Sequence, residues 1–475
     1  MSSAATISKN AAYLAVAELV SKLLQFFIIV YAARMLGAAD YGKFSFALAF
    51  SMIIIVFFDA GIYTLLVREI SRKKEWTGKY LANTIALKVI IGAIVFLCAV
   101  IFLESLGFPP ENKQAAYVMT LFALFSSYTE IFYSSFRGHE KMGYDAVLKV
   151  LRMLMLTGAA FYVLKNSMGV IWFCLMFVIV EAIILLLAYL IQILKFEKLY
   201  FEADTKMMKH IFHEAWPFGV SFTFSSIYFY VDSLILSKIR GNAEVGIYNA
   251  AYSMAVAILF IPQVYTTAIY PVMFRFFSSK APKLDFVYKK SFKYLYILGW
   301  PISTGVFFLA HDIIRIFFGN EYSSSAIVLQ IVAGFILLKF MNSVFGTTLS
   351  AIDKQRSRMT AQMWTAIVNV GLNLVLIPFY GFLGAAIATL VTEVFLIYVY
   401  YGAISKDMGS IDFMSFAWKP IIASIAMALF LFYTGWGFIP KIVCGSMIYA
   451  IVILATKIFD KEDLELMGSV FPRKS

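Results

Sequence analysis

The residues of this sequence best placed to do chemistry are polar side chains inside long apolar stretches. A charge within a bilayer is costly, and by default it marks the binding or movement of a polar substrate or an ion. Cations at such positions attract phosphate groups, and acids pair with a cation or take up a proton or a sodium ion. The candidate substrate-binding residues are Lys22, Arg34, Asp59, Lys88, Glu130, Tyr228, Asp232 and Lys339.

Each basic candidate also has a structural interpretation. Lys22 follows Glu18 by four residues, so the two can neutralise each other on one helix face. Lys88 and Lys339 lie on the inner parts of their apolar stretches and can extend to the membrane surface. Arg34 lies near a turn, where a turn or headgroup contact is the simpler interpretation. In the functional alternative, Lys22 and Lys88 contact an anionic substrate.

The acidic candidates are weighed in the same way. Asp59 precedes Ala60 and Gly61, small residues that allow helices to approach closely, and it can serve a structural pair or a coupling ion. Glu130 lies on a polar stripe and is expected to line a cavity. Asp232 follows several Ser and Tyr residues, Tyr228 among them, which suits a hydrogen-bonding wall; its alternative is a polar contact within the fold.

Composition decides what kind of element must position these side chains. Of 475 residues, 61% are hydrophobic and 14% charged, against roughly 45–50% and about 25% in soluble domains. A bilayer supplies the apolar surroundings that a soluble core of this size cannot, and only helices and closed barrels satisfy their backbone there. The runs lack the two-residue alternation of barrel strands. The sequence therefore predicts an all-α polytopic membrane protein.

Apolar runs of spanning length number about fourteen. They lie near residues 11–33, 44–67, 81–104, 115–136, 144–164, 168–194, 215–237, 245–274, 291–310, 324–350, 359–379, 382–403, 412–435 and 438–456. Lys and Arg are roughly four times more abundant in one set of alternate connections, the set that includes both chain ends. By the positive-inside rule, both termini are expected in the cytoplasm.

Metal binding and catalysis are not expected. The three cysteines lie inside apolar runs, without metal-ligand or disulfide spacing. The four histidines lie in or beside loops and form no cluster. We predict no metal, no cofactor and no enzymatic activity, with a coupling proton or sodium ion left open. The high net charge is explained by membrane topology, so no nucleic-acid partner is expected.

The chain contains a weak internal repeat. The segment Gly37–Ser45 matches Gly241–Asn249 at an offset of 204 residues, with glycines, an acid and an aromatic residue in common. Glu181 and Glu393 match at an offset of 212. Six spans separate the copies, which predicts a parallel repeat. We expect an N-terminal lobe over 1–200, a C-terminal lobe over 201–405, each of six helices, and two further helices with a cytoplasmic tail over 406–475.

A series of short motifs then resembles a known family. The motifs are Ala33-Arg34-Met35-Leu36-Gly37, Phe58-Asp59-Ala60-Gly61-Ile62-Tyr63, Tyr230-Val231-Asp232, Val245-Gly246-Ile247-Tyr248, Tyr270-Pro271, Phe318-Gly319-Asn320-Glu321-Tyr322 and the stretch 373–386. Together they resemble the oligosaccharide and polysaccharide (Wzx-type) flippases of the multidrug/oligosaccharidyl-lipid/polysaccharide exporter superfamily, which also holds the MATE-like transporters.

The resemblance implies a MATE-like pair of lobes around a cavity. It implies alternating access, in which a polyprenyl-pyrophosphate-linked oligosaccharide moves from the inner to the outer leaflet of the cell membrane for surface polysaccharide biosynthesis. A monomer is expected, with a polysaccharide polymerase or glycosyltransferases as candidate partners.

Three alternatives remain from the sequence. A cation-coupled multidrug antiporter of the same superfamily would have an acidic cavity with few basic residues. A lipid II-type flippase would differ only in the sugar. A membrane glycosyltransferase or polymerase is disfavoured, because the longest hydrophilic connections, near 195–213 and 275–293, are short and basic.

Overall fold

The described part of the protein is almost entirely helical. The computed structural model describes residues 3–199, 204–279, 283–409, 411–459 and 462–463, and within them it contains fourteen α-helices, two short 3-10 helices and no strand. The all-α architecture predicted from composition is confirmed. The end of the predicted cytoplasmic tail, residues 464–475, lies outside the described residues.

Ten helical stretches in the described residues are long and apolar enough to cross a bilayer. Two of them, Tyr13–Asp59 and Gln355–Met408, have 47 and 54 residues. Each is interrupted by a glycine with non-helical dihedral angles, Gly37 in the first and Gly381 in the second. Since about 20 residues suffice for one crossing, each of these stretches accommodates two of the predicted spans.

The chain divides into two compact units. Unit 1 comprises residues 1–253 and 362–385, and unit 2 comprises 254–361 and 386–475. These boundaries differ from the predicted lobe boundary at residue 200, because α7 and most of α8 belong to unit 1. The six-helix lobes remain a prediction.

Unit 1 is built around α1, which packs on α4, α5 and α7. The two segments of α1 on either side of Gly37 allow it to contact several neighbours. Phe46 and Phe50 of α1 form a hydrophobic cluster with Leu103 and Phe108. The helices of this unit are α1 (Ser3–Asp59), α2 (Ile62–Arg72), α3 (Thr77–Ser105), α4 (Pro110–Gly138), α5 (Met142–Lys165), α6 (Val170–Lys195), α7 (Thr205–Arg240) and most of α8 (Asn242–Ile258), with the middle of α12 (Gln355–Met408).

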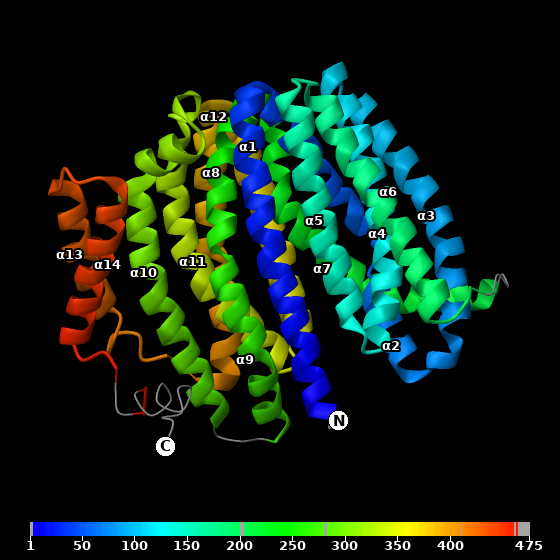
Figure 1. The fold of residues 1–475 in the computed structure, drawn as a ribbon. Helices are drawn as coiled ribbons and strands as arrows, with labels where there is room; N and C mark the ends of the chain where they lie inside the picture. Colours follow the sequence, from blue (N-terminus) through cyan, green and yellow to red (C-terminus); the bar gives the residue numbers. More distant parts are fainter. Residues whose placement is uncertain (1–2, 200–203, 280–282, 410, 460–461, 464–475) are drawn as a thin grey trace. The chain divides into compact units, whose positions relative to one another are not determined.

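Unit 2 is centred on α10, which packs on α11 and on the pair formed by α13 and α14 (Figure 1). A hydrophobic cluster that includes Leu309, Met427 and Tyr449 holds that pair in place. The helices of this unit are α9 (Phe260–Ser278), α10 (Lys283–Phe317), α11 (Ser325–Ala351), the ends of α12, α13 (Trp418–Tyr433) and α14 (Phe438–Ala455).

The two copies of the repeated motif pack against each other within unit 1. A Cβ atom added to Gly42 would lie 1.8 Å from the carbonyl oxygen of Asn242, and one added to Gly246 would lie 2.1 Å from that of Ala38. Ala38 and Gly42 occupy the repeat positions of Asn242 and Gly246, so the contact is reciprocal. Only glycine allows this approach of α1 and α8, which gives the repeated Gly a direct structural reason.

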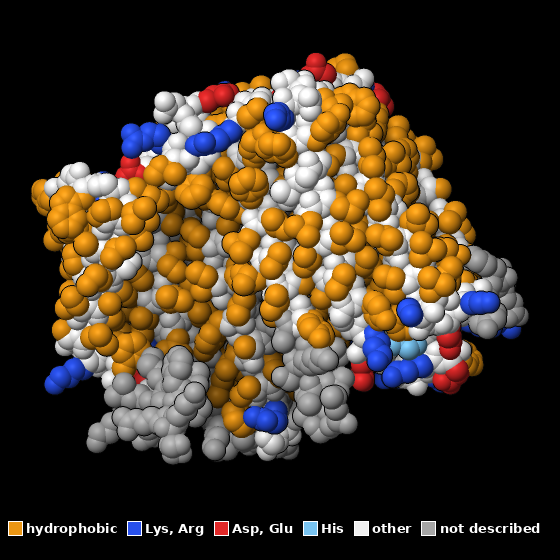
Figure 2. Space-filling view, viewed as in Figure 1, with side chains coloured by type: hydrophobic (Ala, Val, Ile, Leu, Met, Phe, Trp, Pro, Cys, Tyr) orange, Lys and Arg blue, Asp and Glu red, His pale blue; other side chains and the backbone are white. Residues whose placement is uncertain are grey.

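The surface is that of a membrane protein. On the face shown in Figure 2, hydrophobic side chains cover the middle of the helices, and Lys, Arg, Asp and Glu gather near the helix ends. Large apolar side chains such as Leu97, Tyr398 and Phe432 are more than half exposed. Such extended apolar exposure marks contact with membrane lipid. The protein is a multi-pass membrane protein.

Candidate functional site

A polar pocket of about 350 Å³ lies within unit 1. It combines two carboxylates with hydroxyl groups and aromatic rings, and no Lys or Arg lines it among the described residues. We call it the acidic pocket. Helices α1, α2, α4 and α7 contribute its lining, which consists of Ile55, Val56, Asp59, Tyr63, Ser126, Ser127, Glu130, Phe222, Ser225, Ser226, Phe229 and Tyr230.

Asp59 enters this pocket at a helix break. The predicted span 44–67 is interrupted after Asp59, where Ala60 and Gly61 both adopt positive φ. Gly61 tolerates this conformation, whereas Ala60 bears strain of about 1–2 kcal/mol. Helix α7 packs directly on the break, because a Cβ atom at Gly219 would lie 2.7 Å from the carbonyl carbon of Ala60. The break therefore holds the Asp59 carboxylate at the end of α1.

Lys88 lies behind the pocket and is held by Asp59. Its Nζ donates to Asp59 Oδ1 at 3.0 Å, to the Ser127 carbonyl oxygen at 2.9 Å and to Ser127 Oγ at 2.7 Å. All three donors of the ammonium group thus have acceptors. The side chain is 2% exposed, so Lys88 does not extend to the membrane surface. The structure pairs it with an acid of the pocket.

Glu130 begins a chain of alternating charges. Arg137 donates to Glu130 at 2.7 Å and to Asp145 at 2.7 Å, and Lys149 lies 3.2 Å from the same Asp145. Asp145 is fully buried, and its two cations compensate the cost of burying the carboxylate. Glu130 therefore lines the acidic pocket, while its charge is balanced from the side away from the pocket.

Asp232 and Tyr228 lie on α7 but do not line the acidic pocket. Asp232 accepts hydrogen bonds from the Tyr248 hydroxyl at 2.9 Å and from Asn373 Nδ2 at 2.6 Å. It thereby joins α7 to α8 and α12 inside unit 1. This geometry favours the alternative interpretation of Asp232 as a contact within the fold. Tyr228 is buried and its ring packs on Phe229.

Lys339 belongs to a buried polar cluster in unit 2. Its Nζ donates to Glu393 at 3.3 Å, and Asn342 donates to the other oxygen of the same carboxylate at 2.7 Å. The repeat-equivalent Glu181 of unit 1 is likewise paired, with Arg152 at 3.4 Å. The two matched acids thus each bind a cation of a neighbouring helix.

The other two candidates are more exposed. Lys22 lies 3.9 Å from Glu18, and both side chains are about one third to one half exposed. Arg34 is exposed at the start of the kink before Gly37. Neither lines the acidic pocket. Of the eight predicted residues, the structure brings together Asp59 and Glu130 at the pocket, with Lys88 behind Asp59.

Several partners at this site were not predicted from the sequence. The examples are Ser127, which accepts from Lys88, Tyr63, which lines the pocket, and Arg137, which pairs with Glu130. A helical spacing of seven residues between Glu130 and Arg137 was an available signal, because it places both on one face. The described residues contain no group of three or more His, Cys, Asp or Glu arranged to hold a metal ion.

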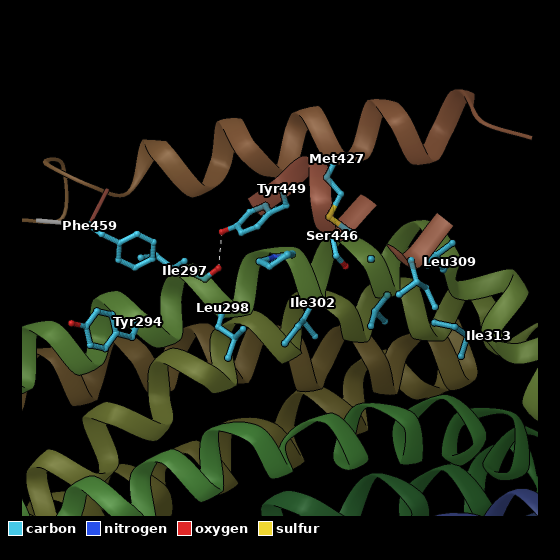
Figure 3. Close-up of a pocket in the computed structure, with 14 residues that line it drawn as sticks. Tyr294, Ile297, Leu298, Ile302, Leu309, Ile313, Met427, Ser446, Tyr449 and Phe459 are labelled. Carbon is cyan, nitrogen blue, oxygen red and sulfur yellow. Dashed lines mark hydrogen bonds between the residues drawn. The ribbon is translucent and has the colours of Figure 1, made fainter. Parts of the chain in front are cut away.

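Unit 2 contains an apolar groove of about 620 Å³ between α10, α13 and α14 (Figure 3). Ile302 and Leu309 of α10 face Met427 of α13 and Ser446 of α14 across it. The Tyr449 hydroxyl donates to the Ile297 carbonyl oxygen at 2.6 Å, which removes a polar group from the lining. The groove therefore offers an almost wholly hydrocarbon surface.

Comparison with known proteins shows the family to which this chain belongs. The profile of the family described as polysaccharide biosynthesis protein matches residues 7–277, more than half of the chain. The chain belongs to this family. The MatE profile matches residues 217–375. The family resemblance expected from the short motifs is confirmed.

Two curated relatives are similar to this chain along most of their own length. A protein described as a probable low-salt glycan biosynthesis flippase of Haloferax volcanii is 23% identical, over 81% of this chain and 80% of its own. A capsular polysaccharide biosynthesis protein of Staphylococcus aureus is 23% identical, over 83% of this chain and 98% of its own.

Two solved structures share the family's fold. The lipid II flippase in an inward closed conformation matches with a TM-score of 0.78 at 17% identity, covering 92% of this chain and 97% of its own. An inward-facing multidrug MATE transporter matches with a TM-score of 0.64 at 14% identity, covering 81% of this chain and 95% of its own. At these identities the likeness concerns the fold.

Proposed function

We propose that this protein is a flippase that moves a polyprenyl-pyrophosphate-linked oligosaccharide from the inner to the outer leaflet of the cell membrane by alternating access. It acts as a transporter and not as an enzyme. Both termini are in the cytoplasm, as the distribution of basic residues predicts. The relatives described as a glycan flippase and a capsular polysaccharide protein support this substrate class.

The observation that carries the proposal is the chemistry of the acidic pocket. A sugar hydroxyl moved into hydrocarbon without a partner costs several kcal/mol, on the order of 4–8 in the least polar solvents. The pocket offers acceptors and donors for such hydroxyls in four serines, two tyrosines and two carboxylates, and offers Phe222 and Phe229 as apolar faces. It therefore provides a site at which sugar hydroxyls keep hydrogen-bond partners.

The lipid part of the cargo has different needs. An isoprenoid tail requires only apolar surroundings, worth roughly 25 cal/mol per Å² of buried surface when compared with water. The hydrocarbon of the surrounding bilayer meets that need. We assign the tail to the bilayer and the sugar head to the acidic pocket.

A coupling ion has a candidate site in the same pocket. Asp59 and Glu130 are acids with access to the cavity, and each is also bound to a cation on its other side. Protonation of Asp59, or a sodium ion beside it, would weaken its hold on Lys88. This gives a physical link between ion uptake and the position of α1 relative to α3.

One observation favours a second candidate, the cation-coupled multidrug antiporter. The acidic pocket presents carboxylates and rings without a lining Lys or Arg in the described residues, and this combination also suits an organic cation. The two functions differ in cargo, so transport assays separate them.

The test uses purified protein in liposomes. A fluorescent lipid-linked oligosaccharide placed in one leaflet becomes accessible to a membrane-impermeant reagent if the protein flips it. We expect faster exchange than in protein-free liposomes. No change in exchange, together with proton- or sodium-driven export of an organic cation, would replace the flippase by the antiporter.

A matched pair of variants on α7 tests the pocket itself. The double substitution Ser225→Ala and Ser226→Ala removes two lining hydroxyls, and each lost hydrogen bond is expected to slow transport roughly five-fold. Thr223→Ala is the control, because its hydroxyl donates to the Gly219 carbonyl oxygen of its own helix and does not line the pocket. Equal rates for both variants would move the sugar path away from the acidic pocket.

A further inference from the structure

Unit 2 contains a second polar space that none of the predicted residues reaches. It has a volume of about 390 Å³, within the roughly 300–1,000 Å³ typical of small-molecule sites. We call it the hydroxyl cavity. It is lined by Thr266, Thr267, Tyr270, Thr347, Ser350, Gln355 and Arg358, without a carboxylate among the described residues.

The cavity lies where three helices of unit 2 meet near the connection between α11 and α12. Ser350 belongs to the last turn of α11, and Gln355 and Arg358 belong to the first turn of α12. The first N–H groups of a helix have no partners inside it and carry partial positive charge. The predicted topology places this connection on the cytoplasmic side.

Arg358 is the charged group of this cavity. Its Nη1 donates to Ser350 Oγ at 2.7 Å, and its Nε lies against Gly346, 3.7 Å from where a Cβ would be. In the described part of the chain, no carboxylate oxygen lies within ion-pair distance of it. The side chain is only partly exposed. A guanidinium positioned by a serine and left without a counter-charge is prepared for an external anion.

Three cations inside the predicted spans are held differently. Lys88, Arg152 and Lys339 are each paired with an internal acid. A charge inside the bilayer requires such compensation, whereas Arg358 precedes the predicted span 359–379, at the connection expected on the cytoplasmic side. For Arg358 the polar neighbours are hydroxyls and an amide, which can donate to an anion as well as accept from the guanidinium.

We propose that the hydroxyl cavity binds the phosphate ester of a lipid head, with Arg358 as its charged contact. Guanidinium groups bind phosphate oxygens with two parallel hydrogen bonds, and a helix N-terminus adds to the attraction. The ligand is the pyrophosphate of the lipid-linked cargo or the phosphate of an anionic membrane lipid. The identification of the ligand as the cargo pyrophosphate rests on the proposed function, whereas the phosphate site itself does not.

Binding of defined lipids to the intact protein tests the proposal. The probes are a polyprenyl pyrophosphate and phosphatidylglycerol, each added to the protein in nanodiscs of phosphatidylcholine, with bound lipid measured by native mass spectrometry. For Arg358→Ala we expect roughly ten-fold to hundred-fold weaker binding of at least one probe, the range for losing a hydrogen bond to a charged group. Arg356→Ala is the control, because that side chain is exposed and does not line the cavity.

A second variant covers the case in which Arg358→Ala does not fold. Gln355→Glu is nearly isosteric, lies at the helix start where an acid is favourable, and places an internal carboxylate near Arg358. It should weaken probe binding by a similar factor while the protein remains folded.

The outcomes separate the sources of the phosphate. Loss of pyrophosphate binding alone identifies the cargo, and loss of phosphatidylglycerol binding alone identifies a membrane lipid. Wild-type affinity for both probes in both variants overturns the site. Since binding is measured without transport, a wild-type protein that binds the probes but flips no oligosaccharide would refute the proposed function and leave the site intact.

Discussion

The acidic pocket of unit 1 and the hydroxyl cavity of unit 2 use charge differently. Beside the acidic pocket, Lys88 and Arg137 are bound to Asp59 and Glu130, so the carboxylates are exposed to the pocket and the cations are shielded behind them. In the hydroxyl cavity, Arg358 itself lines the space and is held by Ser350. Two polar spaces of similar volume therefore suit different ligands: sugar hydroxyls or a cation in the first, an anion in the second.

The difference also predicts how each space contributes to stability. A cation bound to an internal acid stabilises the fold only while its partner is present. A cation held by a hydroxyl group alone contributes little to folding, and its removal should be visible mainly in ligand binding. Substitutions in the two regions should therefore separate stability from function.

The largest effect is expected for Asp59→Ala. It leaves the buried Lys88 without a counter-charge, which costs about 3–5 kcal/mol in the free energy of unfolding. Thermal unfolding in detergent measures the loss. The double variant with Lys88→Met removes the stranded charge and should recover most of the stability. A single variant as stable as the wild type would show that Asp59 does not hold Lys88.

A smaller effect is expected for Glu130→Gln. Arg137 keeps Asp145 as its partner, so the loss should be about 1 kcal/mol, the typical net value of one hydrogen bond. The same unfolding assay applies. Because Glu130 lines the pocket, transport should fall more than stability does. A loss as large as that of Asp59→Ala would mean that the pair with Asp145 does not compensate Arg137.

Arg358→Ala is expected to change stability by no more than about 1 kcal/mol, because it breaks no ion pair and loses only the hydrogen bond to Ser350. Its effect should instead appear in lipid binding. An unfolding free energy lowered as much as in Asp59→Ala would indicate a hidden structural partner and erase the contrast between the two regions.

The smallest effect on stability is expected for Lys22→Ala. Its pair with Glu18 is partly exposed and worth about 0.3–0.5 kcal/mol. The sequence interpretation of Lys22 as a phosphate contact predicts impaired transport at nearly unchanged stability. Glu18→Ala is the matched control, because it breaks the same pair and retains the lysine. Normal transport in both variants would remove Lys22 from the substrate path.

The sequence by itself determined the class of the protein. Its apolar runs predict membrane-spanning helices, and its motifs predict the family. The sequence repeat places Gly42 and Gly246 at equivalent positions of the two copies. The reciprocal contact of α1 and α8 explains why both positions are glycine. These properties depend on composition and short-range pattern, because the bilayer imposes helices on any sufficiently long apolar segment.

Only the tertiary structure decided which charges act together. Lys88 meets Asp59 across 29 positions of sequence. Arg358 has no acid within ion-pair distance in the described chain, although Asp353 is close to it in sequence. The break at Ala60 and Gly61 likewise depends on packing of α7 against it. The sequence shows that an embedded charge needs compensation. Which side chain provides it depends on how helices pack, because partners are set by contact across neighbouring helices and not by distance along the chain.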